Sequence, residues 1–493
     1  MRPRTLTLLT CAAAFGIASN AQLPTLLKDI NPTGGSNAIY LTCFGDMVYF
    51  NATDGVNGAE LWKTDGTEAG TVMVKDMNPG TGSGFPRYFT EMNGVIYFSA
   101  TDGINGIQLW STDGTEGGTQ VVLSLADVAG LIEWTDFVAL GDRIFFRGRD
   151  AVNGSELWST DGTAAGTQLF MDINPGLVNS SIQYPMVYDD KLHFRAADAT
   201  SGGEPWVSDG TMAGTHVIAD IVPGSPGCDA SDFIGAGGLV FFRATTAAQG
   251  AELWVTDGTE AGTHLVKDIQ PGFNGSLPSN MAEHNGLLYF RAYTTQFDNF
   301  IWQSDGTLAG TVALPQPVYD YNMATNLCSY NGWLYFTAFG DFHEQLWRTD
   351  GTAEGTQEFL YPGSDVVQPL SSAGPKLSCN GDLLMRASYM AATGMELYTL
   401  NFPTGVAEHA ERNIQLYPIP ATDEVWVDIG EASTGPATLV VRDLLGRTMA
   451  DPEPITASGA GRYLIHLDDL APGTYIIDLK VGENRWSRRI VKA

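Results

Sequence analysis

Short hydrophobic runs, separated by turn-forming residues, recur along most of the chain. Between residues 81 and 123 the runs fall at Arg87–Met92, Val95–Ala100, Ile107–Thr112 and Thr119–Leu123. The breaks between them hold the hairpin turn Asn93-Gly94, the cluster Thr101–Gly106 and a turn that begins at Asp113. Because aromatic and β-branched residues fill the second run, the pattern predicts four short antiparallel strands.

The same pattern repeats with a fixed period, and the tryptophans mark its phase. Six of them are each 48 residues apart, Trp347 follows after 45, and Tyr398 takes the same place after 51. The series is Trp62, Trp110, Trp158, Trp206, Trp254, Trp302 and Trp347, and each is followed by an Asp-Gly-Thr turn at Asp65, Asp113, Asp161, Asp209, Asp257, Asp305 or Asp350. A β-solenoid usually has shorter coils, whereas four strands per repeat of this length are typical of a β-propeller blade. We therefore predict an all-β, eight-bladed β-propeller.

The eighth unit lacks its last strand. It ends in MELYTLNF, without the Asp-Gly-Thr turn and the strand that should follow. Near the start of the chain, Thr25–Ile30 (TLLKDI) copies the fourth strand seen at Val72–Met77 (VMVKDM). We expect this N-terminal strand to complete the last blade, because closing the ring removes exposed sheet edges.

Three resemblances agree with this fold. The segment Ala52–Trp62 resembles the tryptophan-docking motif of quinoprotein dehydrogenases, which are eight-bladed propellers whose Trp residues pack between blades. The TDGT turn resembles the Asp-box hairpin of sialidase propellers. The whole unit resembles the ELWxxDGT repeat family of exported bacterial proteins over about residues 26–400. The first two imply a structural role for the repeated Trp and Asp, whereas the third family is defined by sequence and has no established common activity.

The N-terminus has the pattern of a secretory signal. Arg2 and Arg4 precede an apolar run from Leu6 to Ala18, and small residues lead to a cleavage site between Ala21 and Gln22. The run is too short to cross a bilayer as a helix. We therefore predict removal of residues 1–21 during export and no membrane span.

The repeat stops after Phe402 and a different domain follows. A polar linker at 403–412 precedes alternating strands and turns that predict a small β-sandwich at 413–493. This region resembles the subtype A C-terminal sorting domain of the type IX secretion system of Bacteroidetes, although a fibronectin-like adhesion module is an alternative. The matching positions include Pro418, Pro420, Gly446, Gly473, Tyr475 and Lys492. The predicted propeller thus occupies residues 22–402.

Composition and charge narrow the function. The hydrophobic fraction is 44%, which supports a packed core, and only 17% of residues are charged. The net charge is −30, and residues 413–493 contribute only 8 basic and 11 acidic side chains, so nearly all the acidity belongs to the ring. A surface this acidic repels phosphate backbones and disfavours nucleic acid as a partner.

No complete catalytic or metal motif stands out. Asp54, Asn57 and Glu60 share one hairpin, as do Asp150, Asn153 and Glu156, and these oxygens suit either calcium or simple turns. We predict the turn role and no cofactor, with calcium as the alternative. Cys43, Cys228, Cys328 and Cys379 remain after the signal and allow three disulfide pairings.

The repeat departs most from its pattern between Gln296 and His343. There, unusual loops supply aromatic residues beside Asp298, Asp320 and Asp341. The aromatic set is Phe297, Phe300, Tyr319, Tyr321, Phe342 and His343. Aromatic rings with nearby carboxylates suit carbohydrate or cationic ligands, so we predict a ligand face near the sixth and seventh blades, unless the drifted loops simply pack on each other.

Together these patterns predict a secreted or outer-surface propeller that passes through the periplasm. Its partners would be the secretion translocon and sorting machinery, and a glycan or surface-protein ligand. We predict a non-catalytic binding or display module. The alternative is a secreted enzyme on the same scaffold, quinoprotein-like or glycosidase-like.

Overall fold

The computed structural model shows an all-β protein in two compact units, Met1–Asn401 and Phe402–Ala493. It describes residues 25–128, 131–294, 299–315, 322–339, 344–353, 355–358, 371–379, 382–388, 395–400, 415–417, 424–428, 437–443, 453–455, 462–467, 470, 473–481 and 484–492. The predicted secretory signal, with Ala21 and Gln22, and the 403–412 linker lie outside these residues. Among them, the only helical turn is the 3₁₀ turn η1 (Leu125–Asp127), and no helix is long and apolar enough to cross a bilayer.

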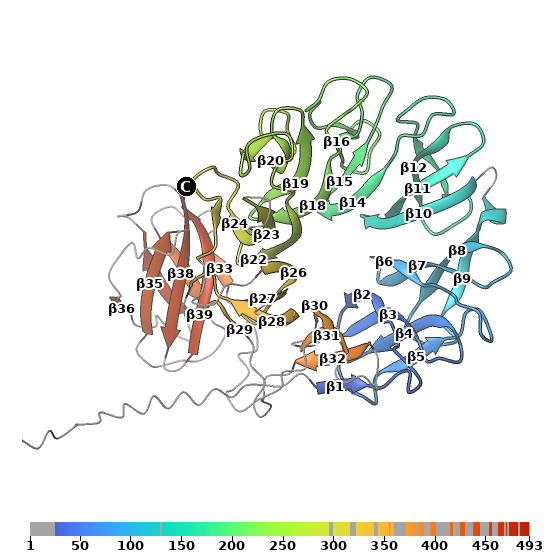
Figure 1. Ribbon diagram of the computed structural model, residues 1–493, viewed down its shortest axis with the longest axis horizontal. Helices are drawn as coiled ribbons and strands as arrows, with labels where there is room; N and C mark the ends of the chain where they lie inside the picture. Colours follow the sequence, from blue (N-terminus) through green and yellow to red (C-terminus); the bar gives the residue numbers. More distant parts are fainter. Residues whose placement is uncertain are drawn as a thin grey trace, which may run out of the picture. The chain divides into compact units, whose positions relative to one another are not determined.

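Seven four-stranded sheets are each built from four consecutive antiparallel strands, and we number them as blades 1 to 7 (Figure 1). Blade 1 consists of β2 (Ile39–Phe44), β3 (Met47–Thr53), β4 (Ala59–Thr64) and β5 (Val72–Lys75). Blade 2 consists of β6 (Arg87–Met92), β7 (Val95–Thr101), β8 (Ile107–Thr112) and β9 (Gln120–Ser124). Blade 3 consists of β10 (Leu131–Leu140), β11 (Arg143–Asp150), β12 (Gly154–Thr160) and β13 (Gln168–Met171). The four strands predicted between residues 81 and 123 are confirmed as β6 to β9.

Blades 4 to 7 follow the same plan. Blade 4 consists of β14 (Gln183–Tyr188), β15 (Lys191–Ala196), β16 (Glu204–Ser208) and β17 (His216–Val217), and blade 5 consists of β18 (Ser231–Ala236), β19 (Leu239–Thr246), β20 (Gly250–Thr256) and β21 (His264–Lys267). Blade 6 consists of β22 (Ser279–His284), β23 (Leu287–Tyr293), β24 (Asn299–Ser304) and β25 (Val312–Ala313). Blade 7 consists of β26 (Asn322–Tyr330), β27 (Trp333–Phe339), β28 (Glu344–Thr349) and β29 (Gln357–Glu358). The first strand of each blade contacts the first strand of the next, so these inner strands line a common axis.

An eighth four-stranded sheet joins the two ends of the first unit. It consists of β30 (Ser371–Cys379), β31 (Asp382–Ser388), β32 (Glu396–Leu400) and β1 (Thr25–Lys28). β1 pairs antiparallel with β32, with Leu26 opposite Tyr398, and β30 contacts β2 of blade 1. The predicted count of eight blades is therefore corrected to seven, because the eighth repeat unit supplies only three strands and takes its fourth from the N-terminal segment. The predicted exchange of this strand is confirmed.

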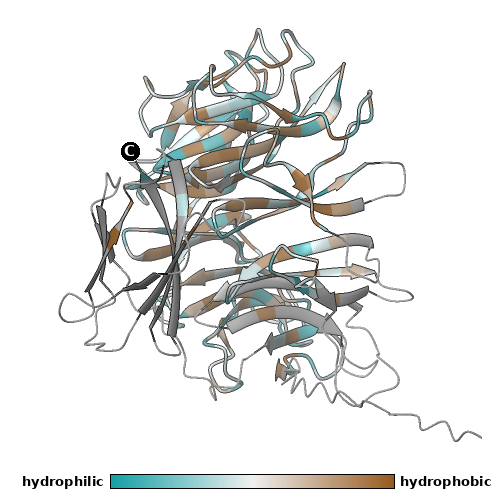
Figure 2. Cartoon of the chain, turned by 90° about the vertical axis from the view of Figure 1, so that its left-hand side faces the viewer, coloured by the Kyte–Doolittle hydropathy of each residue, from teal (hydrophilic) through white to brown (hydrophobic). Residues whose placement is uncertain are grey.

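Hydrophobic cores lie between successive sheets. The core between blades 1 and 2, for example, combines Leu61 and Val74 of blade 1 with Phe98 and Trp110 of blade 2. A further core joins Leu27 of β1 and Leu397 of β32 to Phe50 and Trp62 of blade 1. This core therefore packs the composite sheet, in which the two ends of the first unit meet, against blade 1. Figure 2 shows that the hydrophobic segments fall mainly on the strands. The period of the repeat thus reflects one inter-blade core per unit.

The cysteines are not all equivalent. Cys43 on β2 is disulfide-bonded, whereas Cys228 is a fully buried free thiol whose Sγ donates to the Gly203 carbonyl. Burial raises the pKa of the Cys228 thiol. Each of the three complete pairings of the four cysteines includes Cys228, so all three are excluded.

The C-terminal unit contains two antiparallel sheets. One holds β33 (Gln415–Tyr417), β34 (Glu424–Asp428) and β37 (Arg462–His466), and the other holds β36 (Glu453–Ile455), β35 (Ala437–Asp443), β38 (Gly473–Val481) and β39 (Asn484–Lys492). Val441, Ile465 and Tyr475 are buried. Lys492 is only 7% exposed, and its ammonium group donates to the Leu467 carbonyl. This lysine therefore holds the last strand in place.

Candidate functional site

The repeated Asp-Gly-Thr turn is closed by its own side chains. In blade 1 the Asp65 carboxylate accepts from the Thr67 amide at 2.9 Å and the Thr67 hydroxyl at 2.7 Å, and that hydroxyl accepts from the Gly70 amide. These hydrogen bonds lower the pKa of Asp65. The same carboxylate contacts recur at Asp113, Asp161, Asp209, Asp257, Asp305 and Asp350. The aspartates are thus committed to turn formation.

The repeated tryptophans are core residues. Trp62, Trp110 and Trp158 are 7%, 4% and 5% exposed, and the others of the series are buried or nearly so. The Trp110 and Phe98 rings of one blade stack at 6.5 Å. A ring enclosed in this way has no face to offer a ligand.

Buried glutamates link five of the eight sheets to a neighbouring connection, and the sequence had drawn attention to only two of them, Glu60 and Glu156, as hairpin or calcium oxygens. Both Glu60 carboxylate oxygens accept backbone amides at 2.7 Å, one from Met77 and one from Gly84. Glu156, Glu204, Glu252 and Glu396 make the same kind of contact. Burial raises the pKa of Glu60 and Glu156 to about 7. The signal was present in the sequence, since each glutamate stands two residues before a repeat Trp or Tyr.

The hairpin oxygens considered for calcium serve separate structural tasks. Asp54 accepts from the Val56 and Asn57 amides at 2.8 Å and from the Asn57 side chain at 2.7 Å. The Glu60 carboxylate is instead directed to the connection between blades 1 and 2. Asp150 and Glu156 divide in the same way. Within the described part of the chain, no group of three His, Cys, Asp or Glu side chains is placed to hold a metal ion.

The predicted aromatic ligand face falls mostly outside the described residues. Phe297, Tyr319, Tyr321, Phe342 and His343 all lie there. Phe300 is half-buried on β24 and packs against the core between blades 5 and 6, at the place where other blades carry the buried glutamate. This ligand face therefore stays a prediction. Of the predicted sorting positions, Pro418, Pro420 and Gly446 also lie outside the described residues, whereas Gly473 begins β38.

A second set of equivalent residues, which the sequence did not predict, lies on the inner strands of the blades. In blades 1 to 7 the inner strand contains a β-bulge near its start, and one residue in that bulge has a positive φ near 56°. We call these the bulge residues: Tyr40, Tyr88, Asp136, Tyr184, Asp232, Asn280 and Asn326. A left-handed backbone costs a non-glycine residue about 1–2 kcal/mol. The fold therefore imposes this conformation on each blade while its side chain varies.

Arginines gather beside the bulge residues. Residues 22–412 contain ten arginines. Five of them occupy the equivalent position on the second strand of five different sheets, where each is paired with a residue of the inner strand. They are Arg147, Arg195, Arg243, Arg291 and Arg386, whose cross-strand partners are Thr135, Gln183, Ser231, Ser279 and Gly374. We call this the arginine register. In a ring so acidic, this concentration of positive charge is a local exception.

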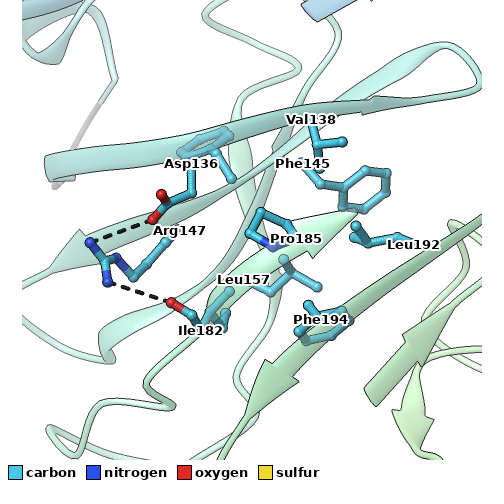
Figure 3. A pocket seen from close by; sticks show the side chains of 10 residues that line it. Asp136, Val138, Phe145, Arg147, Leu157, Ile182, Pro185, Leu192 and Phe194 are labelled. Carbon is cyan, nitrogen blue, oxygen red and sulfur yellow. Dashed lines mark hydrogen bonds and ion pairs between the residues drawn. The ribbon is translucent and has the colours of Figure 1, made fainter. Parts of the chain in front are cut away.

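The described ion pairs neutralise the first three of these arginines. Arg147 lies 3.6 Å from Asp136 and also donates to the Ile182 carbonyl of blade 4 (Figure 3). Arg195 and Arg243 lie 2.9 Å and 3.2 Å from Asp229 and Asp232. Burial and the Asp136 charge raise the pKa of neighbouring Tyr88. Two of these ion pairs therefore balance acidic bulge residues, Asp136 and Asp232, and Arg147 also joins adjacent blades.

The cavity beside Arg147 is too small for a ligand. Its volume is about 10 Å³, and its walls are mainly apolar, with Val138, Phe145 and Leu192 among them (Figure 3). That is barely room for one water molecule. A second cavity, bounded by Phe85, Arg87 and Ser99 of blade 2, is larger at about 110 Å³.

Comparisons with solved structures return proteins of low sequence identity. A puromycin hydrolase is 14% identical over 74% of this chain, which spans 61% of that protein, with a TM-score of 0.42. The β-propeller domain of the Trilobed protease from Pyrococcus furiosus is 10% identical over 66% of this chain and 99% of that one, with a TM-score of 0.36. An oligogalacturonate lyase from Vibrio parahaemolyticus is 13% identical over 78% and 95% of the two chains, with a TM-score of 0.42. These likenesses carry no functional argument.

The family comparison concerns the second unit. No curated protein matches the chain. The predicted membership of the ELWxxDGT repeat family therefore stays a prediction. Residues 415–493 match the secretion system C-terminal sorting domain, and this part of the chain is a sorting domain of that family.

Proposed function

We propose that this protein is an exported or cell-surface β-propeller that binds or displays a ligand without catalysis and is delivered by the type IX secretion system. The sorting domain at residues 415–493, which follows a propeller, is the observation that carries this proposal. We further propose that the seven complete blades and the composite sheet act as one closed ring. Contacts between β30 and β2 support this closure.

The use of the repeated polar groups supports a non-catalytic role. The Asp-Gly-Thr carboxylates close turns, and the buried glutamates hold connections between blades. These carboxylates are already bonded to backbone amides, and so they are unsuited to general acid or base work on a substrate. The variable side chains stand instead on the bulges of the inner strands. Such an arrangement, a rigid repeated frame with varied side chains on one part, is typical of binding scaffolds.

Export provides the direct test. The full chain and a variant without residues 413–493 are expressed in a bacterium that has the type IX route, and surface exposure is measured by protease accessibility on intact cells. We expect only the full chain to reach the surface. Residues 403–493 fused to a periplasmic reporter are the matched control, and they should carry the reporter outside.

Mass spectrometry of the mature protein sharpens the test. We expect a new N-terminus near Gln22 and a C-terminus in or after the 403–412 linker. An intact Met1–Ala493 form outside the cell would contradict the proposed processing. Surface delivery of the variant without residues 413–493 would contradict the proposed route.

A further inference from the structure

In blade 2 the arginine stands on the inner strand instead of the second strand. In blades 3, 5 and 6 the second strand carries the arginine and the inner strand carries a hydroxyl residue, as in Thr135 opposite Arg147. In blade 2 the inner strand carries Arg87 and the second strand carries Ser99, and these two residues are also cross-strand partners. The same pair of side chains is therefore present in exchanged positions.

The exchange leaves Arg87 without a carboxylate. Arg147, Arg195 and Arg243 each have an aspartate within 3.6 Å. Among the described residues, Arg87 has no ion pair or side-chain hydrogen bond, and its guanidinium lies 5.3 Å from the centre of the Tyr88 ring. Arg87 is nevertheless half-buried. A half-buried guanidinium gains more from a carboxylate than an exposed one, because water screens the pair less.

The exchange also opens a space. Ser99 is too short to fill the room that an arginine takes at this register, and the cavity of about 110 Å³ lies against Ser99, Arg87 and Ile107. In blade 4 the residue two repeats after Ile107 is Gly203, and a side chain there would clash with the guanidinium of Arg195. The arginine thus occupies in blade 4 the region that is vacant in blade 2. The space exceeds that of a single water several-fold.

The rim of this cavity is apolar and held in position. Phe85 is 58% exposed although its φ is 49°, an uncommon conformation for a bulky residue. Its amide donates to the Ala59 carbonyl, and the preceding amide of Gly84 donates to Glu60. The buried glutamate of blade 1 therefore helps to hold the backbone that carries Phe85 beside the cavity. Ile107 and Ala100 provide the remaining apolar wall.

We propose that this cavity binds a small organic carboxylate with an apolar or aromatic skeleton. Arg87 would receive the carboxylate through paired N–H donors, the geometry that a guanidinium offers best. Phe85 and Ile107 would cover the carbon skeleton. Few hydroxyl partners line the cavity for a polyhydroxylated ring, since Ser99 donates to the Arg87 carbonyl and Thr101, which accepts from the Gly103 amide, has a single proton to donate. The proposal rests on the proposed binding function and names its ligand chemistry.

Titration of the purified mature protein tests the site. The probe is phenylacetate, followed by calorimetry or ligand-observed NMR, with phenylacetamide to test the charge and glucuronate to test the apolar skeleton. We expect saturable binding of phenylacetate and at least about tenfold weaker binding of the other two. Equal binding of the amide, or tighter binding of glucuronate, would overturn the proposed ligand class, and absence of saturable phenylacetate binding would overturn the site.

Two variants locate the binding. Arg87→Gln should weaken phenylacetate binding at least about tenfold. Ser99→Arg, which restores the arrangement of other blades, should abolish binding while the protein melts as before, and it keeps the test decisive if Arg87→Gln fails to fold. Arg291→Gln is the matched control, because Arg291 stands at the equivalent register of blade 6 and donates to the Ser279 hydroxyl. Unchanged binding in Ser99→Arg would refute the proposal. Since the protein is purified first, this result is independent of the export test.

Discussion

The Asp-Gly-Thr turns and the bulges of the inner strands both recur in each of blades 1 to 7, yet they recur in different ways. In the turns the side chains recur, because the carboxylate and the threonine hydroxyls themselves make the structure. In the bulges the backbone recurs and the side chains differ, from Tyr40 to Asp136 to Asn326. A residue type that recurs in every blade therefore stabilises the fold. A backbone conformation that recurs with different residues instead marks a position where the side chain can change without loss of the fold.

The largest expected effect tests the frame as a whole. Deleting residues 23–31 removes β1, exposes the edges of β32 and the composite sheet, and deprives the closing core of Leu27 and Ile30. Loss of these two buried side chains alone costs about 3–6 kcal/mol. We expect a lower melting temperature and aggregation, measured by calorimetry and light scattering. A monomeric variant with the parent's melting temperature would refute closure by β1.

The next effect tests the turns at two adjacent glycines. A Cβ on Gly118 would clash with the Asp113 carboxylate, whereas a Cβ on Gly117 meets open space. We expect Gly118→Ala to lower the unfolding free energy by about 1–3 kcal/mol. Gly117→Ala should leave it unchanged or raise it by up to about 1 kcal/mol. Denaturant unfolding of the two variants gives the comparison, and equal effects would contradict the assigned role of the carboxylate.

A smaller effect tests the buried glutamates through pH. The pKa of Glu60 and Glu156 is raised to about 7, so the folded state holds protons that the unfolded chain loses near pH 4.5. Their contribution to stability is therefore full below pH 4.5 and is lost as pH rises through about 7. The variant with Glu60→Gln and Glu156→Gln removes this dependence.

The measurement is the difference in melting temperature between parent and double variant at pH 5 and pH 8. We expect the parent's advantage to be larger at pH 5. Comparison at equal pH cancels the opposite dependence of His193 and His284, whose pKa burial lowers to about 4. A difference that grows towards pH 8 would show that the ionised carboxylates are the stabilising form.

The smallest effect tests the bulges. Tyr184 is 44% exposed with a φ of 56°, and Asn280 and Asn326 stand at the same position in blades 6 and 7. Asparagine tolerates this conformation better than tyrosine. Tyr184→Asn should therefore change the unfolding free energy by less than about 0.5 kcal/mol. A large loss in denaturant unfolding would mean that this side chain belongs to the frame.

The positions of the strands could be predicted from the sequence. The alternation in residues 81–123 located β6 to β9 to within a residue or two, because each strand has its own hydrophobic face and its own turn residues. The copied TLLKDI segment likewise located β1. The role of Glu60 and Glu156 was not predicted, because each was interpreted as part of a surface hairpin rather than as a buried acceptor of backbone amides.

Local sequence determined the strands, turns and repeat length, since hydrogen bonds such as those of Asp65 span only a few residues. Only the tertiary structure decided which side chains meet across blades. Nothing in the sequence near Tyr88 or Tyr184 indicates a left-handed backbone, because the bulge is imposed by packing of neighbouring inner strands. The unpaired state of Arg87 depends likewise on Ser99, twelve residues away on another strand, and on aspartates that other blades provide. Charge balance and cavities are properties of the assembled ring, and so they appear only once distant residues share the same space.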